Sequence, residues 1–447
     1  MLKALRSKYP RSLLIGTLTL LVLLFIGGIL WVKNSGLIIA KLLDTHQENF
    51  SDIRLQQPSA STGKELPGET ILMETQRIPV GIEFDPVHER VAVWRLSNGA
   101  GGIPKYSIFL GSQGIAEREL NRSGTDLVGR GFFDFQGRFI YELAPDGQRC
   151  SQTINIDGQE VGKGYGLRMS PNKRHFAYYV CEGLYKWFVV VDGQASSKKY
   201  SFSGGWSDIV FSPDGTKHAY TAKSSKGWFL VINETEGPAY SMISGGPPVF
   251  SEDGQLLAYV ASDHSSSAFA VVRNLKTGEE RRYKNLPLVP YYPSGLAFTG
   301  TDGDAIAFIA QVGDRRLLTI NGKVTSDLPY KADEDEAATF RLLAISKDGK
   351  RFAYNKSGFH YSRDVVNNQE LSESEQFVAF SPDGLSFATI RQRGKQKALA
   401  INGSEGRVYD EIFPNTVTFG SDGRQVNYIA IDRDRILRVW QDGNTTE

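Results

Sequence analysis

The sequence predicts an all-β protein, a β-propeller of eight or nine four-stranded blades preceded by one N-terminal transmembrane helix. Three observations predict this architecture. A phrase of the form Phe-Ser-Pro-Asp-Gly recurs along the chain, each copy leads into short apolar segments typical of strands, and residues 12–32 carry no charge. With 40% hydrophobic and 11% aromatic residues in 447, the composition is that of an ordered globular protein.

The uncharged segment 12–32 is long enough to cross a membrane once. As a helix it would span about 31 Å, which matches a hydrocarbon core of about 30 Å. Basic residues dominate segment 1–11, so the positive-inside rule places it in the cytoplasm. No small-residue cleavage pattern follows the apolar run, which favours an uncleaved signal anchor over a signal peptide. We expect a single-pass cell-membrane protein whose remainder lies in the periplasm or extracellular space.

Residues 33–70 are expected to form a juxtamembrane stalk and linker. Apolar residues recur at helical spacing between 36 and 55, and a stretch rich in Pro, Ser and Gly follows from 58 to 68. A spacer between the membrane and the repeats accounts for both features.

Residues 71–447 repeat one phrase. Its best copies lie at 211–215 and 380–384, each followed by an apolar strand. Degenerate copies start at Phe84, Phe133, Met169, Phe250, Phe298, Ile345 and Phe419. The nine starts have a mean spacing of about 42 residues, which is typical of four-stranded propeller blades. One degenerate copy could be an insertion, so eight and nine blades both remain open.

Each repeat divides into four predicted strands. In the copy at 211, an inner strand at 208–211 ends in a Pro-Asp-Gly turn, and further strands are expected at 217–222, 228–232 and 238–243. The last copy holds only three strands. Segment 71–78 is therefore predicted to supply the fourth and close the ring.

These phrases resemble the propeller repeats of the TolB type, and the resemblance covers residues 71–447. It implies the propeller fold. It implies no single activity, since similar repeats occur in periplasmic scaffold proteins, in the propeller halves of some serine peptidases and in some sugar-acid lyases. TolB itself carries a separate amino-terminal domain where this chain has its anchor and stalk.

The motifs do not favour an enzyme. The repeated Asp residues all precede Gly in hairpin turns, so turn formation explains them. They are Asp214, Asp253, Asp302, Asp348, Asp383 and Asp422. The sequence contains no Gly-x-Ser-x-Gly elbow, no His-Glu-x-x-His motif and no phosphate-binding loop, and we predict no cofactor.

Two pairs of residues leave alternatives open. His264 and His360 occupy the same place in their repeats, just past the second strand. Sugar-acid lyases with similar propellers use several His around one metal, so this resemblance implies the alternative of a metal-dependent sugar-acid lyase or glycan-binding enzyme. Two His alone do not make a metal site. Cys150 and Cys181 lie in neighbouring repeats and could form a disulfide in an exported domain, although the sequence does not fix their separation.

The irregular loops indicate where binding would occur. One rim of the ring carries short Asp-Gly and Asn-Gly turns, whereas the opposite rim carries longer, dissimilar loops, which is where binding residues gather on a rigid frame. Candidates of the types enriched in interfaces are Trp206, Asp208, Tyr291, Tyr292, Arg341 and Tyr409. We predict a non-catalytic scaffold for a protein or peptide partner. Nucleic acid is disfavoured, because the chain beyond residue 33 is slightly acidic.

Overall fold

The computed structural model describes the propeller repeats and not the predicted anchor. The described residues are 69–74, 79, 81–98, 104–119, 130–143, 152–183, 186–201, 208–264, 267–286, 295–300, 302–312, 315–329, 339–357, 362–421 and 423–442. The segments predicted as cytoplasmic (1–11), transmembrane (12–32) and stalk (33–68 of 33–70) lie outside them. Within the described part, no helix is long and apolar enough to cross a membrane.

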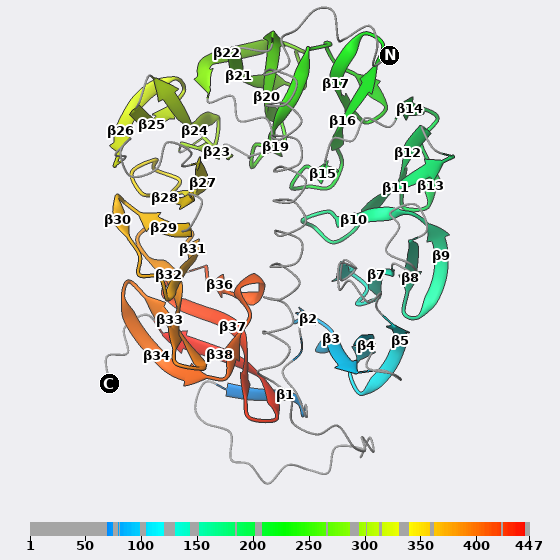
Figure 1. Ribbon diagram of the computed structural model, residues 1–447, viewed down its shortest axis with the longest axis vertical. Helices are drawn as coiled ribbons and strands as arrows, with labels where there is room; N and C mark the ends of the chain where they lie inside the picture. Colours follow the sequence, from blue (N-terminus) through cyan, green and yellow to red (C-terminus); the bar gives the residue numbers. More distant parts are fainter. Residues whose placement is uncertain are drawn as a thin grey trace, which may run out of the picture. The chain divides into compact units, whose positions relative to one another are not determined.

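Nine antiparallel sheets follow one another in chain order around a ring (Figure 1), so the protein is a nine-bladed propeller. We number the blades 1 to 9 along the chain. Blade 1 comprises β2 (Gly81–Asp85), β3 (Arg90–Asn98), β4 (Pro104–Leu110) and β5 (Gln113–Glu119). Blade 2 comprises β6 (Gly131–Phe133), β7 (Phe139–Leu143), β8 (Thr153–Ile156) and β9 (Gln159–Lys163). Blade 3 comprises β10 (Tyr165–Met169), β11 (Phe176–Glu182), β12 (Lys186–Val191), β13 (Gln194–Ala195) and β14 (Tyr200–Ser201).

The next blades repeat the same four-strand order. Blade 4 comprises β15 (Val210–Phe211), β16 (His218–Ser224), β17 (Gly227–Ile232) and β18 (Thr235–Glu236). Blade 5 comprises β19 (Met242–Phe250), β20 (Leu256–His264), β21 (Ser267–Asn274) and β22 (Glu280–Leu286). Blade 6 comprises β23 (Leu296–Thr299), β24 (Ala305–Val312), β25 (Arg315–Ile320) and β26 (Lys323–Leu328).

The last three blades complete the series. Blade 7 comprises β27 (Thr339–Ile345), β28 (Phe352–Ser357), β29 (Ser362–Val366) and β30 (Gln369–Glu370). Blade 8 comprises β31 (Glu375–Phe380), β32 (Phe387–Arg393), β33 (Gln396–Ile401) and β34 (Ser404–Tyr409). Blade 9 comprises β35 (Glu411–Ile412), β36 (Thr418–Phe419), β37 (Gln425–Asp432) and β38 (Arg435–Asp442), with the short 3-10 turn η3 (Pro414–Thr416) between β35 and β36.

A strand from the start of the described region pairs with blade 9. This strand, β1 (Glu69–Glu74), runs antiparallel to β38, with Glu69 opposite Val439 and Glu74 opposite Arg435. Glu69 also accepts a hydrogen bond of 2.7 Å from the hydroxyl of Tyr409. The pairing lies two residues nearer the N-terminus than the segment 71–78 expected there.

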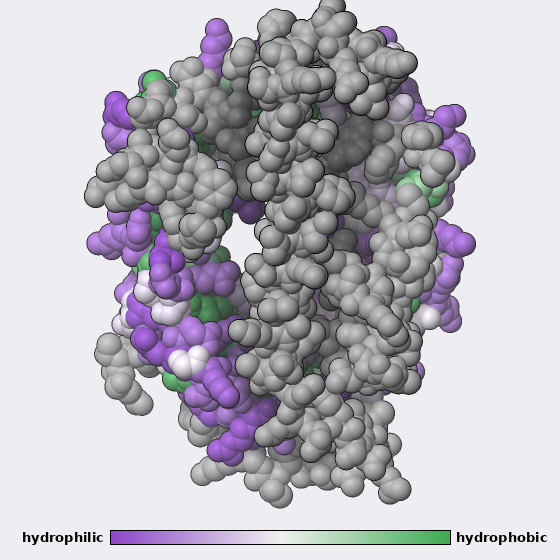
Figure 2. Space-filling view, in the orientation of Figure 1, coloured by the Kyte–Doolittle hydropathy of each residue, from purple (hydrophilic) through white to green (hydrophobic). Residues whose placement is uncertain are grey.

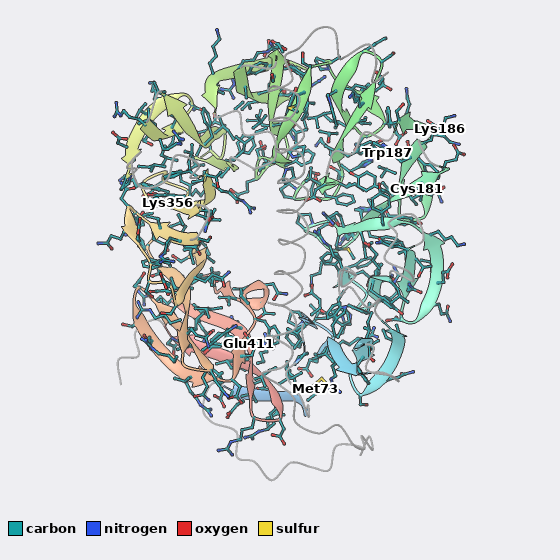
Figure 3. All side chains as sticks on the ribbon, viewed as in Figure 1. Met73, Cys181, Lys186, Trp187, Lys356 and Glu411 are labelled. Carbon is teal, nitrogen blue, oxygen red and sulfur yellow. The ribbon has the colours of Figure 1, made fainter. Side chains whose placement is uncertain are left out.

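The hydrophobic core lies between the faces of adjacent blades. Alternate residues of each strand point to opposite faces, so every sheet contributes to two layers of the core. Between blades 3 and 4, the rings of Tyr179, Trp187, Tyr200 and Tyr220 pack mostly edge to face with centroids 5.2–6.5 Å apart. Trp187 is thus a packing residue (Figure 3). On the surface, hydrophilic side chains predominate among the described residues that Figure 2 shows.

The fourth strands differ most from the expected elements. In blade 4 the fourth strand β18 is two residues long and begins at Thr235, and the segment predicted at 238–243 continues its pairing with the third strand at Tyr240, through an isolated bridge to Trp228. Asn233 and Glu234 both adopt positive φ, and this tight turn brings Glu236 opposite Val231 at once. Residues from Met242 onward already belong to the inner strand of blade 5.

Candidate functional site

Hydrogen bonds within the first turn of each blade account for most of the repeated Asp residues. In blade 4, the hydroxyl of Ser212 donates to Oδ1 of Asp214 at 2.5 Å and accepts from the backbone N–H of Lys217 at 2.9 Å. Hydrogen bonds from Ser212 and Thr216 lower the pKa of Asp214 to about 2. The same Ser–Asp bond recurs at Ser251–Asp253, Ser346–Asp348 and Ser381–Asp383. These carboxylates therefore stabilise turns, while Asp422 lies outside the described residues.

A second hydrogen bond fixes the turn between the third and fourth strands. The residue that opens this turn has positive φ, and its side-chain oxygen accepts from the backbone N–H that begins the second strand. We call this bond the turn strap. It joins His218 to Asn233, Ile306 to Asn321, Phe352 to Asn367 and Phe387 to Asn402, at 2.9–3.0 Å. In blades 2 and 3 the acceptor is an aspartate, Asp157 and Asp192 respectively.

The structure describes three of the six predicted binding residues. Asp208 and Arg341 lie at or near the beginning of inner strands, on the rim with irregular loops. Tyr409 is only 1% exposed, because it packs against Tyr428 and its hydroxyl bonds to Glu69. Its side chain is part of the core and not of the accessible rim. Trp206, Tyr291 and Tyr292 lie outside the described residues.

Asp208 belongs to a group of charges that joins blades 2, 3 and 4. Its carboxylate forms an ion pair with Arg168 of β10. Glu142 of β7 is buried, and its Oε2 accepts from the backbone N–H of Leu167 at 2.9 Å. Burial raises the pKa of Glu142, and hydrogen bonds from Leu167 and Gly166 and the positive charges of Arg130 and Arg168 oppose this. This group links β7 of blade 2 to β10 of blade 3, and β10 to the residue Asp208 that precedes β15 of blade 4.

Arg341 lies on an inner strand that exposes an apolar side chain beside it. In β27, Phe340 and Leu342 pack into the core shared with blade 6. The alternate residues Arg341 and Leu343 consequently lie on the other face of the strand, where Arg341 is exposed and Leu343 is 38% exposed. Arg341 forms no ion pair with the described part of the chain. We call Arg341 and Leu343 the inner-strand patch.

The predicted His and Cys pairs are only partly described. His264 ends β20 and pairs with Ser267, but its side chain and all of His360 lie outside the described residues. Over the part of the chain that the structure covers, no group of three His, Cys, Asp or Glu side chains could hold a metal ion. Cys181 is disulfide-bonded. Its pairing with Cys150 stays a prediction, because Cys150 is not described.

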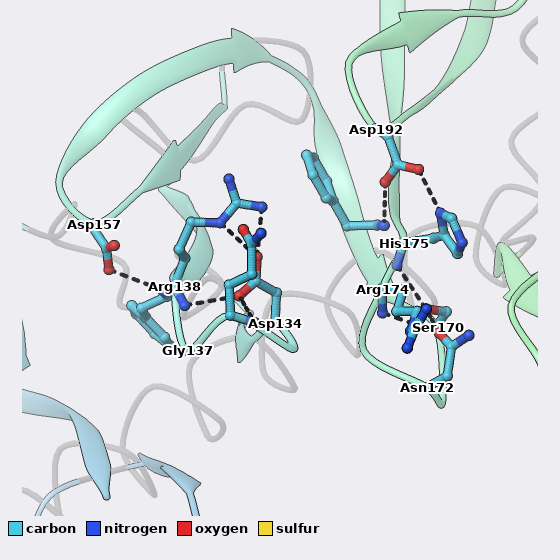
Figure 4. Close-up of polar contacts among 12 residues, drawn as sticks. Asp134, Gly137, Arg138, Asp157, Ser170, Asn172, Arg174, His175 and Asp192 are labelled. Atoms are coloured by element: carbon cyan, nitrogen blue, oxygen red, sulfur yellow. Dashed lines mark hydrogen bonds and ion pairs between the residues drawn. The ribbon is translucent and has the colours of Figure 1, made fainter. Parts of the chain in front are cut away.

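A cleft of about 360 Å³ opens between blades 2 and 3, on the rim of short turns. Figure 4 shows the polar contacts of Asp134, Arg138 and Asp192, three of its charged side chains. Apolar side chains and charged ones line it in nearly equal number. The apolar ones are Ile156, Val161, Met169, Phe176 and Tyr178, and the charged ones are Asp134, Arg138, Arg174 and Asp192. We expected this rim to have a structural role only, and its sequence did not predict a cleft. The sequence feature that could have pointed to the cleft is aspartate at 134, 157 and 192, where the regular repeats have Ser or Asn.

One acid lies directly before a repeat start, a position that no acid occupies in the other blades. Glu83 of β2 lies on the face of blade 1 that carries Ala92 and Trp94, opposite the face that packs on blade 9. Burial raises the pKa of Glu83 to about 7, and the positive charge of Lys173 opposes this only in part. Glu83 is therefore an acid that titrates near neutral pH.

Comparisons with known proteins find similarity in fold only. No protein-family model and no curated protein sequence matches the chain. A structure of TolB from Acinetobacter baumannii is 16% identical with a TM-score of 0.29, over 54% of this chain and 64% of that one. A eukaryotic initiation factor is 11% identical with a TM-score of 0.44, over 79% and 98%.

Prolyl oligopeptidase B from Galerina marginata, in a mutant bound to a 35mer substrate, is 10% identical with a TM-score of 0.39, over 67% of this chain and 54% of that one. The chain thus spans less than two thirds of the TolB and oligopeptidase structures that it resembles.

Proposed function

We propose that this protein is a membrane-tethered, extracytoplasmic propeller that acts as a non-catalytic scaffold for a protein or peptide partner. The partner binds on the rim of irregular loops, where the inner strands begin. The observation that carries this proposal is the inner-strand patch, in which an exposed guanidinium and an exposed leucine lie side by side on the rigid strand β27.

The chemistry of this patch suits a protein surface. Arginine offers a planar fork of donors to carboxylates and carbonyls, and an exposed leucine beside it offers apolar area. Segment 287–294, which precedes β23 in the sequence, contains the predicted contacts Tyr291 and Tyr292. Both features supply the residue types that dominate binding energy at interfaces.

The tether is proposed from the sequence. Segment 12–32 has the length and composition of a membrane span, and its basic flank orients residues 1–11 to the cytoplasm. A propeller held in this way would present its irregular rim outside the cytoplasmic membrane. Protease added to cells with a permeabilised outer layer should degrade the propeller while sparing a short N-terminal fragment. Protection of the propeller would overturn the orientation.

Partner capture tests the rim. Full-length protein is crosslinked in its native membrane, and the variants Arg341→Ala and Leu343→Ser are compared with wild type. We expect each variant to reduce the crosslinked partner by about fivefold or more, since truncating an interface anchor costs at least about 1 kcal/mol.

Matched controls are Arg281→Ala and Leu385→Ser, which change an exposed arginine of β22 and a 62% exposed leucine on the rim of short turns. Neither control should alter capture. Equal capture by all four variants and wild type would remove the inner-strand patch from the proposal.

A further inference from the structure

The cleft between blades 2 and 3 is independent of the inner-strand patch and lies on the other rim. Its apolar wall is supplied by β8, β9, β10 and β11, and Val161 remains 50% exposed there. A volume of about 360 Å³ lies within the usual range of ligand pockets and accommodates one or two side chains. An apolar group placed there would be removed from water.

Close packing fixes the position of Tyr178, which lines the cleft. Gly164 lies against Tyr178, where an added Cβ would approach the ring of Tyr178 to 2.3 Å and the carbonyl of Tyr179 to 2.6 Å. The chain between blades 2 and 3 can therefore approach β11 only because residue 164 has no side chain. Tyr178 is buried as a result and forms a stable wall.

Three of the four charged side chains that line the cleft have polar partners within the described residues. Oδ1 of Asp134 accepts from the backbone N–H groups of Gln136 and Arg138 at 2.9 and 2.8 Å, and Oδ2 accepts from the Arg138 guanidinium at 2.7 Å (Figure 4). Asp192 accepts from the backbone N–H of Phe176 at 2.9 Å, and its other oxygen lies 2.7 Å from Nδ1 of His175.

Arg174 is the exception among these charged groups. Its guanidinium lies over the exposed ring of Phe135, 5.5 Å from the ring centre, and forms no ion pair with any described carboxylate. The ring holds the guanidinium in place without neutralising it. The cleft thus combines an apolar wall with one guanidinium that forms no ion pair among the described residues, which suits an apolar group next to an anion.

We propose that this cleft binds an extended acidic peptide segment, in which an apolar side chain enters between blades 2 and 3 and a neighbouring carboxylate pairs with Arg174. Recognition by charge and shape together requires both groups in the same peptide. This site does not depend on the partner proposed for the irregular rim.

Binding of a defined peptide to the full-length protein in detergent tests the proposal. The probe is a fluorescein-labelled eight-residue Gly/Ser peptide with a central leucine–glutamate pair, and the readout is fluorescence anisotropy. We expect saturable binding that weakens about tenfold when glutamine or lysine replaces the glutamate, and about tenfold when serine replaces the leucine. Equal binding of the glutamate and lysine peptides, or no binding up to the solubility of the probe, would overturn the proposal.

Protein variants locate the bound peptide. Arg174→Gln should weaken binding about tenfold, and Val161→Ser should weaken it by several fold, without changing the circular dichroism spectrum. The controls are Arg281→Gln and Val324→Ser, the latter at a 57% exposed valine on the fourth strand of blade 6.

Loss of peptide binding in Arg341→Ala instead of Arg174→Gln would place the peptide on the irregular rim. That result would overturn the cleft and leave the proposed function standing. Loss of partner capture in Arg341→Ala with peptide binding intact would support both sites separately.

Discussion

Blades 2 and 3 differ from blades 4, 6, 7 and 8 in the residue that accepts the turn strap. The latter blades use asparagine, whereas blades 2 and 3 use Asp157 and Asp192, yet the strap has the same length of 2.9–3.0 Å in all six. An amide oxygen is therefore sufficient for the turn. The turn does not require the negative charges of Asp157 and Asp192, so these carboxylates can make other contacts as well.

Both aspartates make contacts in addition to the turn strap. Asp157 also accepts from Arg90 of blade 1 at 3.0 Å, and Asp192 also contacts His175. The first turn of blade 2 differs in the same sense, because Asp134 occupies the position that Ser212 has in blade 4 and bonds to Arg138. Replacement of neutral turn residues by charged ones thus distinguishes this part of the ring.

The inner strands show a second difference, which sets blades 1 and 3 apart from blades 4 to 8. The residue before each repeat start is charged in blades 1 and 3, at Glu83 and Arg168. In blades 4 to 8 it is small or aliphatic: Val210, Val249, Ala297, Ala344 and Ala379. Blades 4 to 8 thus share one residue type at this position, from which blades 1 and 3 depart.

The largest expected effect comes from Asp134. The side chain is 3% exposed, and Asp134→Ala would remove the acceptor of two backbone N–H groups and leave Arg138 without its carboxylate. We expect the free energy of unfolding to fall by about 3 kcal/mol, as measured by urea denaturation.

The matched variant is Asp214→Ala in the regular blade 4. Asp214 is exposed, so water replaces its hydrogen bonds, and the loss should not exceed about 1 kcal/mol. Equal losses at Asp134 and Asp214 would contradict the distinction between charged and regular turns.

Glu83 should make stability depend on pH. Its pKa is raised from 4.5 to about 7, so the folded protein binds this proton more tightly than the unfolded chain does. Its contribution is complete below pH 4.5 and is lost as pH rises through 7. We expect Glu83→Gln to match wild type at pH 4 and to exceed its free energy of unfolding by up to about 3 kcal/mol at pH 8.

Urea denaturation at the two pH values measures this difference. The control is Glu160→Gln, at an exposed glutamate of β9. Its free energy of unfolding should differ from that of wild type by the same small amount at both pH values. A Glu83→Gln variant that is less stable than wild type at pH 8 would show that the charged form has a stabilising partner.

The repeat starts could be predicted because each depends on a local turn. The complete Phe-Ser-Pro-Asp-Gly phrase occurs at 211–215 and 380–384, and the spacing of about 42 residues identifies the degenerate copies. The structure confirms the propeller and has nine blades, where eight or nine were expected. The fourth strands could not be predicted, because in blade 4 the strand is the two-residue β18, whose pairing depends on the backbone at Asn233 and Glu234. Tyr409 looked accessible because it borders a loop, but its hydroxyl bonds to Glu69, which is 340 residues away in the sequence.

The cleft could not be predicted for a similar reason. Its lining comes from Asp134 to Gly193, and it exists only where β9 of blade 2 and β10 and β11 of blade 3 pack together. A local pattern specifies each turn, but the space between two sheets depends on side chains from both. The substitution of Asp for Asn or Ser was visible in the sequence, although its meaning depends on that packing.

A smaller effect is expected at the strap of blade 8. In Asn402→Ala, the backbone N–H of Phe387 loses its acceptor, and alanine must adopt the φ of 50° that asparagine tolerates. We expect the free energy of unfolding, measured by urea denaturation, to fall by about 1–2 kcal/mol. Asn402→Asp should retain the turn strap and most of the stability. If it lowers the free energy of unfolding as much as the alanine variant does, a charge is not tolerated in this turn.

The smallest effect is expected at Asp192, where the comparison between blades is most direct. Asp192→Asn keeps an oxygen for the N–H of Phe176 and gives blade 3 the residue that blades 4, 6, 7 and 8 already use. It removes only the charge facing His175, and both side chains of that pair are 38% exposed. An exposed ion pair contributes about 0–1 kcal/mol, so the free energy of unfolding should change by less than about 0.5 kcal/mol. A larger loss would mean that the charge itself supports the packing of blades 2 and 3, and the strap would then not be equivalent in the two parts of the ring.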